Sequence, residues 1–308
     1  SGFVPEEIVH IHADGRDTYK RGNTASDTEF AVNGDNTVSF KVTSFSDFVM
    51  YAQASIAEVY KPDGSLKAVC RSSEEILNNL ETGCTVKLLD DLSGVSLSSV
   101  DLKKSAVTLD LAGYSLTGTN GVCTLDVVGG SLTIKDSSGA GTGGITGAPA
   151  VRVGAGATVM LESGTLTGGA EVNGANATFV MTDGTVEGAT AINAVSGSVT
   201  ISGGMITSTT ADQEVTGSAA VEISGGSFAH AVPEAQCADG YMPTTADSSG
   251  RYGVETKPVP VAKAESALGV DQGTFTKIQD AVDAAKARGK VTLLRDSGDY
   301  AKIDYALT

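Results

Sequence analysis

The stretch "SVTISGG" (Ser198–Gly204) decides the fold of this chain, because variants of it return along the sequence. The same phrase is written "AVEISGG" at Ala220–Gly226, "TVMLESG" at Thr158–Gly164 and "TFVMTDG" at Thr178–Gly184. Each copy alternates apolar and polar residues and then reaches a glycine, which is the pattern of a short strand followed by a tight turn. The repetition predicts a stack of similar strands, the hallmark of a solenoid.

The first apolar residue of each phrase belongs to a ladder that returns once in every repeat, at the short, nearly regular period typical of solenoids. Its members are Val86, Val107, Leu132, Val159, Phe179, Val199 and Val221. A second apolar residue follows two positions later in every copy, namely Leu88, Leu109, Ile134, Leu161, Met181, Ile201 and Ile223. Because side chains alternate along a strand, both positions should face the interior and the residues between them should face outward.

Two further ladders complete each repeat. The second one contains Leu166, Val186, Ile206 and Phe228, and the third contains Val172, Ile192 and Val215. Three short strands per repeat with glycine at the corners predict an all-β fold, a right-handed parallel β-helix (solenoid) over residues 55–254.

The solenoid needs a cap, and a helical one is predicted near residues 72–83. The stretch "SSEEILNNLETG" (Ser72–Gly83) begins with a serine cap and an acidic first turn, and it carries apolar Ile76, Leu77 and Leu80. The pattern of residues 1–54 predicts a small antiparallel, β-sandwich-like module that is incomplete at its start. Its hairpin signal is Asn33-Gly34-Asp35-Asn36.

The tail repeats the cap. "SSEEILNNLETGCTVKLL" (Ser72–Leu89) aligns without a gap on "KIQDAVDAAKARGKVTLL" (Lys277–Leu294) at a constant offset of 205. We therefore expect a linker at 255–265 and, over 266–308, the start of a second, truncated β-helix module. A lone first rung cannot bury its own face, so further rungs of a tandem array are expected past Thr308.

Composition narrows the class of protein. The formal net charge of −16 argues against nucleic acid as a partner, because phosphate recognition needs a basic footprint. No apolar run is long enough to predict membrane insertion. The four cysteines, Cys70, Cys84, Cys123 and Cys237, lack the spacing of a zinc site and are expected to be buried free thiols, although a Cys70–Cys84 bridge stays open.

We predict no catalytic residue, no cofactor and no metal site. Asp110, Glu162 and Asp183 occupy predicted outward positions and could pair to cleave a neutral glycan, but single exposed carboxylates are usually surface charges. Between Asp136 and Gly250 the only lysine or arginine is Arg152, so an acidic polysaccharide would be repelled. His10 and His12 could chelate a metal, but alternation predicts a solvated strand face for them.

The cap helix with "TVKLLDDL", the "VTLDLAGYSLTG" rung, the "TISGG" phrases and the closing "CADGYMPT…GRYGVE" resemble one known group of modules. These are the right-handed parallel β-helix modules of large surface-exposed, adhesin-like proteins of gut bacteria, and their fold resembles that of pectate-lyase-like enzymes. The resemblance covers about Ser55 to Glu255. It implies an extracellular or cell-wall-attached stalk or binding surface, and no catalytic motif is carried over.

Three hypotheses of function follow. The first is a non-catalytic adhesin or stalk that presents a surface to a host glycan or host surface protein. The second is a polysaccharide-active β-helix enzyme, a glycoside hydrolase or lyase. The third is a module that binds a host glycoprotein or immunoglobulin. Met160, Val180 and Thr200 occupy outward positions on successive rungs and form the predicted contact patch.

Overall fold

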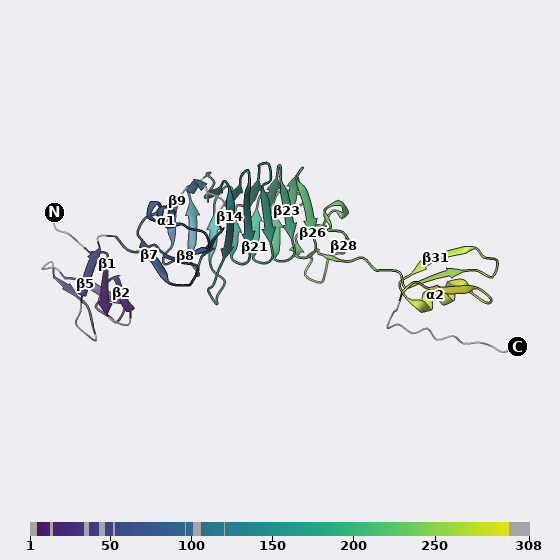
Figure 1. Cartoon of the computed structure of the whole chain (residues 1–308), viewed down its shortest axis with the longest axis horizontal. Coiled ribbons are helices and arrows are strands. Elements are labelled where there is room, and N and C mark those ends of the chain that lie inside the picture. The colour runs from purple at the N-terminus through teal and green to yellow at the C-terminus, as the bar shows by residue number, and fades with distance from the viewer. Residues whose placement is uncertain are drawn as a thin grey trace. The chain divides into compact units, whose positions relative to one another are not determined.

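The structure, a computed structural model, describes residues 5–12, 15–33, 37–42, 47–51, 53–95, 97–100, 106–119 and 121–295. The chain forms two compact units (Figure 1). Unit 1 contains Ser1–Asp239 and Pro243–Glu255, and unit 2 contains Gly240–Met242 and Thr256–Thr308.

Unit 1 begins with a five-stranded sheet in the order β4-β3-β2-β1-β5. Its strands are β1 (Glu7–His12), β2 (Gly15–Gly22), β3 (Glu29–Val32), β4 (Val38–Ser39) and β5 (Asp47–Tyr51). The described residues here form one sheet rather than two layers, so the expected sandwich is not present among them. The β2–β3 pair is parallel, unlike the other pairs, which are antiparallel as predicted. Ile8, Tyr19 and Phe30 form the buried centre of this sheet.

The predicted hairpin in this sheet is confirmed by its flanks. Strands β3 and β4 pair antiparallel, and the Asn33 amide donates to the Thr37 carbonyl at 2.8 Å. Residues 34–36 lie outside the described residues.

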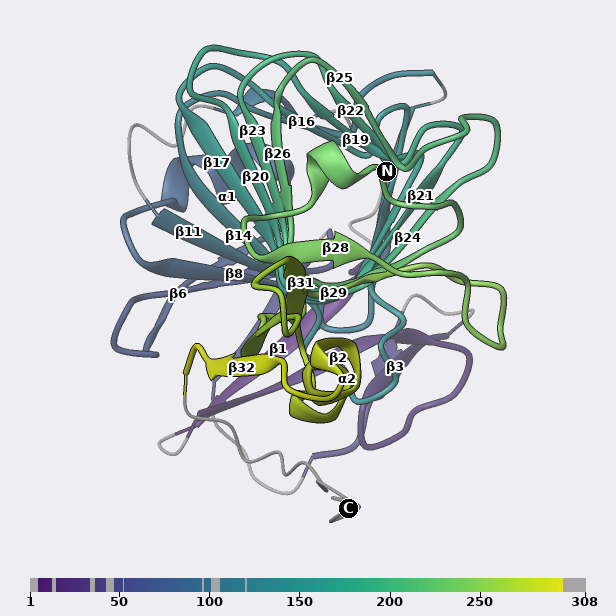
Figure 2. The ribbon, with the colours of Figure 1, turned by 90° about the vertical axis from the view of Figure 1, so that its right-hand side faces the viewer.

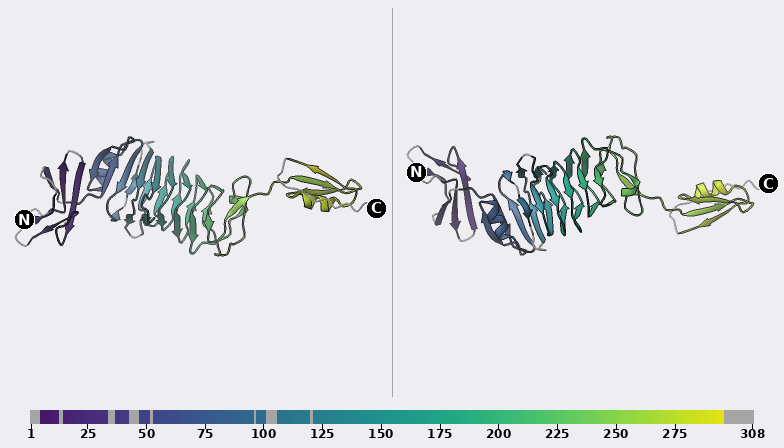
Figure 3. Two further views of the ribbon diagram at one scale, coloured as in Figure 1. Left: turned by 90° about the horizontal axis from the view of Figure 1, so that it is seen from below. Right: turned by 90° about the horizontal axis from the view of Figure 1, so that it is seen from above.

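The solenoid has three sheets, which Figure 2 shows end-on and Figure 3 from two sides as stacks of short strands. The nine-stranded sheet is β26 (Ala220–Ile223), β23 (Ser198–Ile201), β20 (Thr178–Met181), β17 (Ala157–Leu161), β14 (Gly130–Lys135), β11 (Ala106–Asp110), β8 (Cys84–Leu88), β6 (Ala57–Tyr60) and β7 (Leu66–Cys70). The seven-stranded sheet is β27 (Ser227–Phe228), β24 (Met205–Ser208), β21 (Thr185–Gly188), β18 (Thr165–Thr167), β15 (Gly144–Thr146), β12 (Ser115–Gly118) and β9 (Leu92–Val95). The six-stranded sheet is β10 (Leu97–Val100), β13 (Leu125–Val127), β16 (Val151–Val153), β19 (Ala170–Val172), β22 (Ile192–Ala194) and β25 (Val215–Gly217).

The register of the first ladder is confirmed from Val107 to Val221 and that of the second from Leu166 to Phe228. Val159 pairs with Phe179, and Phe179 pairs with Val199, in parallel strands whose ladder residues are buried. The first ladder is wrong at the first rung, where Val107 pairs with Cys84 and Leu109 with Val86, because all three alternate residues Cys84, Val86 and Leu88 face the interior and the pattern does not fix which two align. The third ladder was placed in a partly wrong register. Ile192 and Val215 continue the row of Ala170, whereas Val172 pairs with Ala194. A small inward residue on one rung therefore stacks on a large one on the next. Because the size of the inward residue alternates, the row cannot be recognised from large apolar residues alone.

The cap is a helix together with a hairpin that the repeat pattern of the sequence does not predict. Helix α1 (Ser73–Asn79) starts after Ser72, whose hydroxyl accepts from the Glu75 amide at 3.2 Å, and it ends earlier than predicted. Its Ile76 enters the core, but Leu77 stays exposed. Strands β6 and β7 extend the nine-stranded sheet, with β6 antiparallel to both β7 and β8.

A buried charged cluster joins the N-terminal sheet to this cap. Glu7 is fully buried, and its carboxylate accepts from the Ser55 amide at 2.7 Å and from the Ser55 hydroxyl. Arg71 donates to the same carboxylate at 2.7 Å, and its guanidinium lies 3.3 Å from the centre of the Tyr51 ring. We call Glu7, Tyr51, Ser55 and Arg71 the junction cluster.

The segment after the last rung is short and irregular. The 3-10 helix η1 (Glu234–Gln236) follows β27, and β28 (Tyr241–Pro243) pairs with β29 (Val254–Thr256). Four free cysteines are present, of which Cys70, Cys84 and Cys123 are buried as expected and Cys237 is half-buried. Burial raises the pKa of the Cys70 and Cys123 thiols.

Unit 2 is a small sheet with one helix. It consists of β30 (Ala262–Glu265), β31 (Asp271–Phe275), α2 (Ile278–Ala285) and β32 (Lys290–Leu293), with sheet order β31-β30-β32. The expected linker at 255–265 is wrong at its end, because its final segment forms β30. Neither described helix is long and apolar enough to cross a membrane. Residues 296–308 of the predicted second module lie outside the described residues.

Candidate functional site

The predicted contact patch lies on the outer face of the nine-stranded sheet. Met160 on β17 pairs with Val180 on β20, and Val180 pairs with Thr200 on β23. Adjacent strands are about 4.8 Å apart, so the three side chains form one continuous row. All three are half-buried. Thr133 and Glu222 extend the row at its two ends.

A hollow of about 440 Å³ lies at the corner where the same three rungs leave this sheet. Strands β17, β20 and β23 end just before it, and β18, β21 and β24 begin within it. Its side-chain lining is polar except for one methionine and consists of Ser163, Thr165, Asp183, Thr185 and Met205. We call this the corner hollow.

Stacked glycines shape the corner hollow. Gly184 has φ +89°, and a Cβ at this position would lie 2.7 Å from the Gly164 carbonyl oxygen. Glycine takes positive φ without strain and permits this close approach of two backbones. The corners therefore stack closely and leave backbone groups, hydroxyls and one carboxylate at the surface.

Asp136 fixes the loop beside the corner hollow. Its carboxylate accepts from the amides of Gly113 and Gly143 at 2.7 Å each and from the amide and hydroxyl of Ser138. Partial burial alone would raise the pKa of Asp136, but these hydrogen bonds outweigh burial and hold its pKa below the ordinary value. The Asp136 amide in turn donates to the Ser163 hydroxyl at 2.8 Å. A lining residue of the hollow is thereby held in place.

The predicted outward position of the Asp110 carboxylate is wrong. Asp110 is 6% exposed, and its Oδ1 accepts from the amides of Ala112 and Ser137 at 3.0 Å each. Asp110 is the last residue of β11 and lies at a turn, where backbone amides need an acceptor and a carboxylate can supply it. The alternation of inward and outward residues along a strand does not predict such a contact.

The structure does not bring Asp110 and Glu162 together. Strand β14 lies between β11 and β17, so the two positions are two strand spacings apart, about 10 Å. Lys135 pairs with Asp110 in the intervening row. Glu162 and Asp183 are exposed, and Asp183 alone of the three carboxylates lines the corner hollow.

The expectation of a solvated face for His10 and His12 is wrong for His10. It is 1% exposed and stacks on Phe48 with ring centres 4.5 Å apart. Its Nδ1 lies 3.5 Å from Asp17 Oδ2, and His12 Nε2 lies 3.6 Å from the same oxygen. Across the residues that the structure describes, no group of three or more His, Cys, Asp or Glu side chains is arranged to hold a metal ion.

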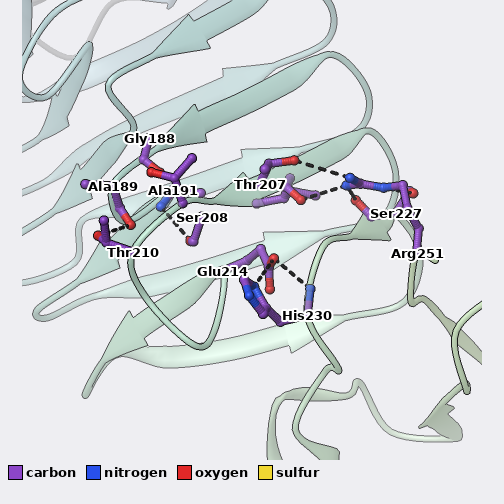
Figure 4. A network of polar contacts seen from close by, with 12 residues as sticks. Gly188, Ala189, Ala191, Thr207, Ser208, Thr210, Glu214, Ser227, His230 and Arg251 are labelled. Atoms are coloured by element: carbon purple, nitrogen blue, oxygen red, sulfur yellow. Dashed lines mark hydrogen bonds and ion pairs between the residues drawn. The ribbon is translucent and has the colours of Figure 1, made fainter. Parts of the chain in front are cut away.

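A second polar region lies at the closing end of the solenoid (Figure 4). The buried Glu214 carboxylate accepts from the His230 amide at 2.9 Å and lies 3.0 Å from His230 Nδ1. Arg251 donates to the Ser227 hydroxyl at 2.6 Å and to the carbonyl oxygens of Ile206 and Ser227. These contacts fasten the closing segment to the last rungs.

The sequence pattern does not indicate this second region. Arg251 lies in the quoted "GRYGVE" phrase, but nothing in the phrase indicates that its guanidinium folds back onto β24 and β27. The corner hollow was also missed. The sequence feature that could have predicted the corner hollow is the Gly-Thr or Gly-Met pair that recurs after each of the strands β17, β20 and β23.

The chain matches no known family, no curated protein and no solved structure.

Proposed function

We propose that this chain is a non-catalytic binding module of an extracellular bacterial surface protein, and that it binds a neutral glycan. The observation that carries the proposal is the corner hollow, which adjoins the row of Met160, Val180 and Thr200 on the same three rungs. The stacked rungs place the corner hollow and this row side by side on one surface.

The lining favours a sugar over a charged ligand. The hydroxyls of Ser163, Thr165 and Thr185 donate and accept hydrogen bonds, and the Asp183 carboxylate accepts them. Sugar hydroxyls need both kinds of partner. The lining holds no lysine or arginine, and the chain carries a net charge of −16, so an anionic ligand would be repelled.

The apolar neighbours supply the remaining contact area. Met205 borders the corner hollow, and Met160 and Val180 lie on the adjoining sheet face. Such side chains pack against the C–H faces of a sugar ring. The open, shallow site favours the end or edge of a glycan chain and weak affinity, which repeated presentation on a surface would strengthen.

A glycan array probed with the full chain tests this proposal, followed by titration calorimetry on the best neutral glycan. We expect Asp183→Ala to weaken binding by about tenfold or more, which corresponds to one lost hydrogen bond to a charged group. The matched control is Asp212→Ala, an exposed aspartate outside the corner hollow, which should leave the affinity unchanged. Binding of anionic glycans only, or equal losses in both variants, would contradict the proposal.

Turnover is tested on the same glycans by assaying reducing ends and unsaturated products. Product formation that Asp183→Ala or Glu162→Ala abolishes would replace the binding module with an enzyme. Binding of a host glycoprotein that persists after enzymatic removal of its glycans would place the contact on protein instead.

A further inference from the structure

Unit 2 reproduces the solenoid cap of unit 1 strand by strand. The numbers of the first residues of β30 and β6 (262 − 57) differ by the same offset as those of β31 and β7 (271 − 66). The first residues of α2 and α1 (278 − 73) differ by that offset again. The sheet order β31-β30-β32 matches β7-β6-β8.

The pairing register is also conserved within this repeat. Ala57 pairs with Cys70 and Leu88, and Ala262 pairs with Phe275 and Leu293. In both caps the register shifts before the last pair of the hairpin, after Val59 in one and after Ala264 in the other. A shared irregularity at the same offset is a stronger sign of one architecture than a shared helix.

The two caps differ in what covers the last strand. In unit 1, β8 lies between β6 and the parallel strand β11, and Leu88 is 2% exposed. In the described part of unit 2, β32 is the edge of its sheet, and its counterpart Leu293 is 60% exposed. Leu294, next along the chain, is 49% exposed. An exposed edge with apolar side chains is a template for another strand.

We propose that unit 2 is a second solenoid cap and that the free edge of β32 is a docking site for a parallel rung strand of the same polypeptide. The docking strand has the pattern of β11, with two inward apolar residues two positions apart, as Val107 and Leu109 are placed on β8. This inference does not depend on the glycan proposal, because it concerns assembly of the solenoid and not its ligand.

The experiment extends the chain with its own rungs. Residues 1–294 are followed directly by a copy of residues 90–255, since Leu294 corresponds to Leu89. Amide hydrogen exchange of β32 is compared between the extended and the original chain by mass spectrometry. We expect exchange in the extended chain to slow on the order of a hundredfold, because edge amides become paired within a cooperative core.

Two variants of the extended chain separate docking from other effects. Leu293→Asp should abolish the slowing, because it places a charge in the new core. Thr292→Asp, whose counterpart Lys87 lies between the inward positions of β8, should retain it.

A cap exchange provides an independent test. Replacing residues 57–89 by 262–294 puts the existing rungs behind the second cap, and protected amides in β11 would support the proposal. Unprotected amides in both the extended chain and the cap exchange would overturn it. Light scattering showing a dimer of the original chain, with β32 already protected, would assign the edge to a second copy and would also overturn it.

Discussion

Two rules determine the environment of single residues in this solenoid. Alternate residues along a strand face inward and outward, and carboxylates at turns accept hydrogen bonds from nearby backbone amides. Val199 shows the first rule. It is 1% exposed and lies between Phe179 and Val221 in the register. The alternation along the strand correctly predicted that Val199 is buried, and it places the next residue on the outer face.

We expect Val199→Asp to lower the free energy of unfolding by about 4 kcal/mol or more, because it buries a carboxylate without a partner. Thr200→Asp should change it by about 1 kcal/mol at most, since Thr200 is outward and the new charge only adjoins Glu222. Urea denaturation followed by circular dichroism measures both. Equal losses would contradict the register.

Asp136 shows the second rule and has a pH signature. We expect Asp136→Asn to cost about 1–3 kcal/mol at pH 7, because amides and a hydroxyl lose their charged acceptor. The folded pKa of Asp136 lies below the unfolded value, so its contribution is present above the ordinary carboxyl pKa of about 4 and is lost as pH falls through the folded value.

Unfolding curves of wild type and Asp136→Asn from pH 7 to pH 2 should therefore converge toward the acid end. Asp183→Asn is the control, and at pH 7 it should change the free energy of unfolding by about 0.5 kcal/mol at most because Asp183 is exposed. A constant difference between wild type and Asp136→Asn at all pH values would show that the carboxylate charge contributes nothing.

At the scale of elements, the rungs could be predicted from the sequence because each one repeats the same short pattern of alternating apolar and polar residues. The hairpin β6–β7 could not, since it occurs once in the solenoid and pairs antiparallel, outside the repeat. Asp110 was misplaced because alternation describes the strand and not the turn that follows. The corner hollow was missed because its shape comes from backbones that approach only when corners stack.

The corners make a prediction of their own. We expect Gly184→Ala to destabilise the solenoid by about 2–4 kcal/mol, because positive φ and a Cβ 2.7 Å from the Gly164 oxygen add strain and a clash. Gly156→Ala also has positive φ, but its Cβ would meet nothing within 4 Å, so about 1 kcal/mol is expected. Thermal unfolding of both variants isolates the effect of close stacking. Equal losses would mean that only the dihedral angle matters.

Across the whole chain, one architectural device is used twice, since the cap of unit 1 returns in unit 2 at a constant offset. The sequence carried this repeat at the helix and first rung, and the structure extends it to a hairpin with little sequence identity. Apolar positions and turn spacing persist where residue identity does not. The caps differ in their surroundings, because the first one carries the junction cluster that holds the N-terminal sheet.

The junction cluster should control how firmly that sheet is attached. We expect Glu7→Ala to cost about 3–5 kcal/mol, because Arg71 would stay largely buried without its carboxylate and the Ser55 amide would lose its acceptor. Hydrogen exchange of β1 and β6 at pH 7 should accelerate by about a hundredfold or more, while the distant rungs β20 and β23 stay protected.

Glu6→Ala is the matched control for Glu7→Ala. Glu6 pairs with Arg21 at 2.7 Å, but both side chains are exposed, at 43% and 44%, so the loss should be about 0–1 kcal/mol. Two adjacent glutamates, each paired with an arginine, would then differ because water solvates one pair and not the other. If both variants accelerated exchange equally, burial of the Glu7–Arg71 pair would have no bearing on attachment of the sheet.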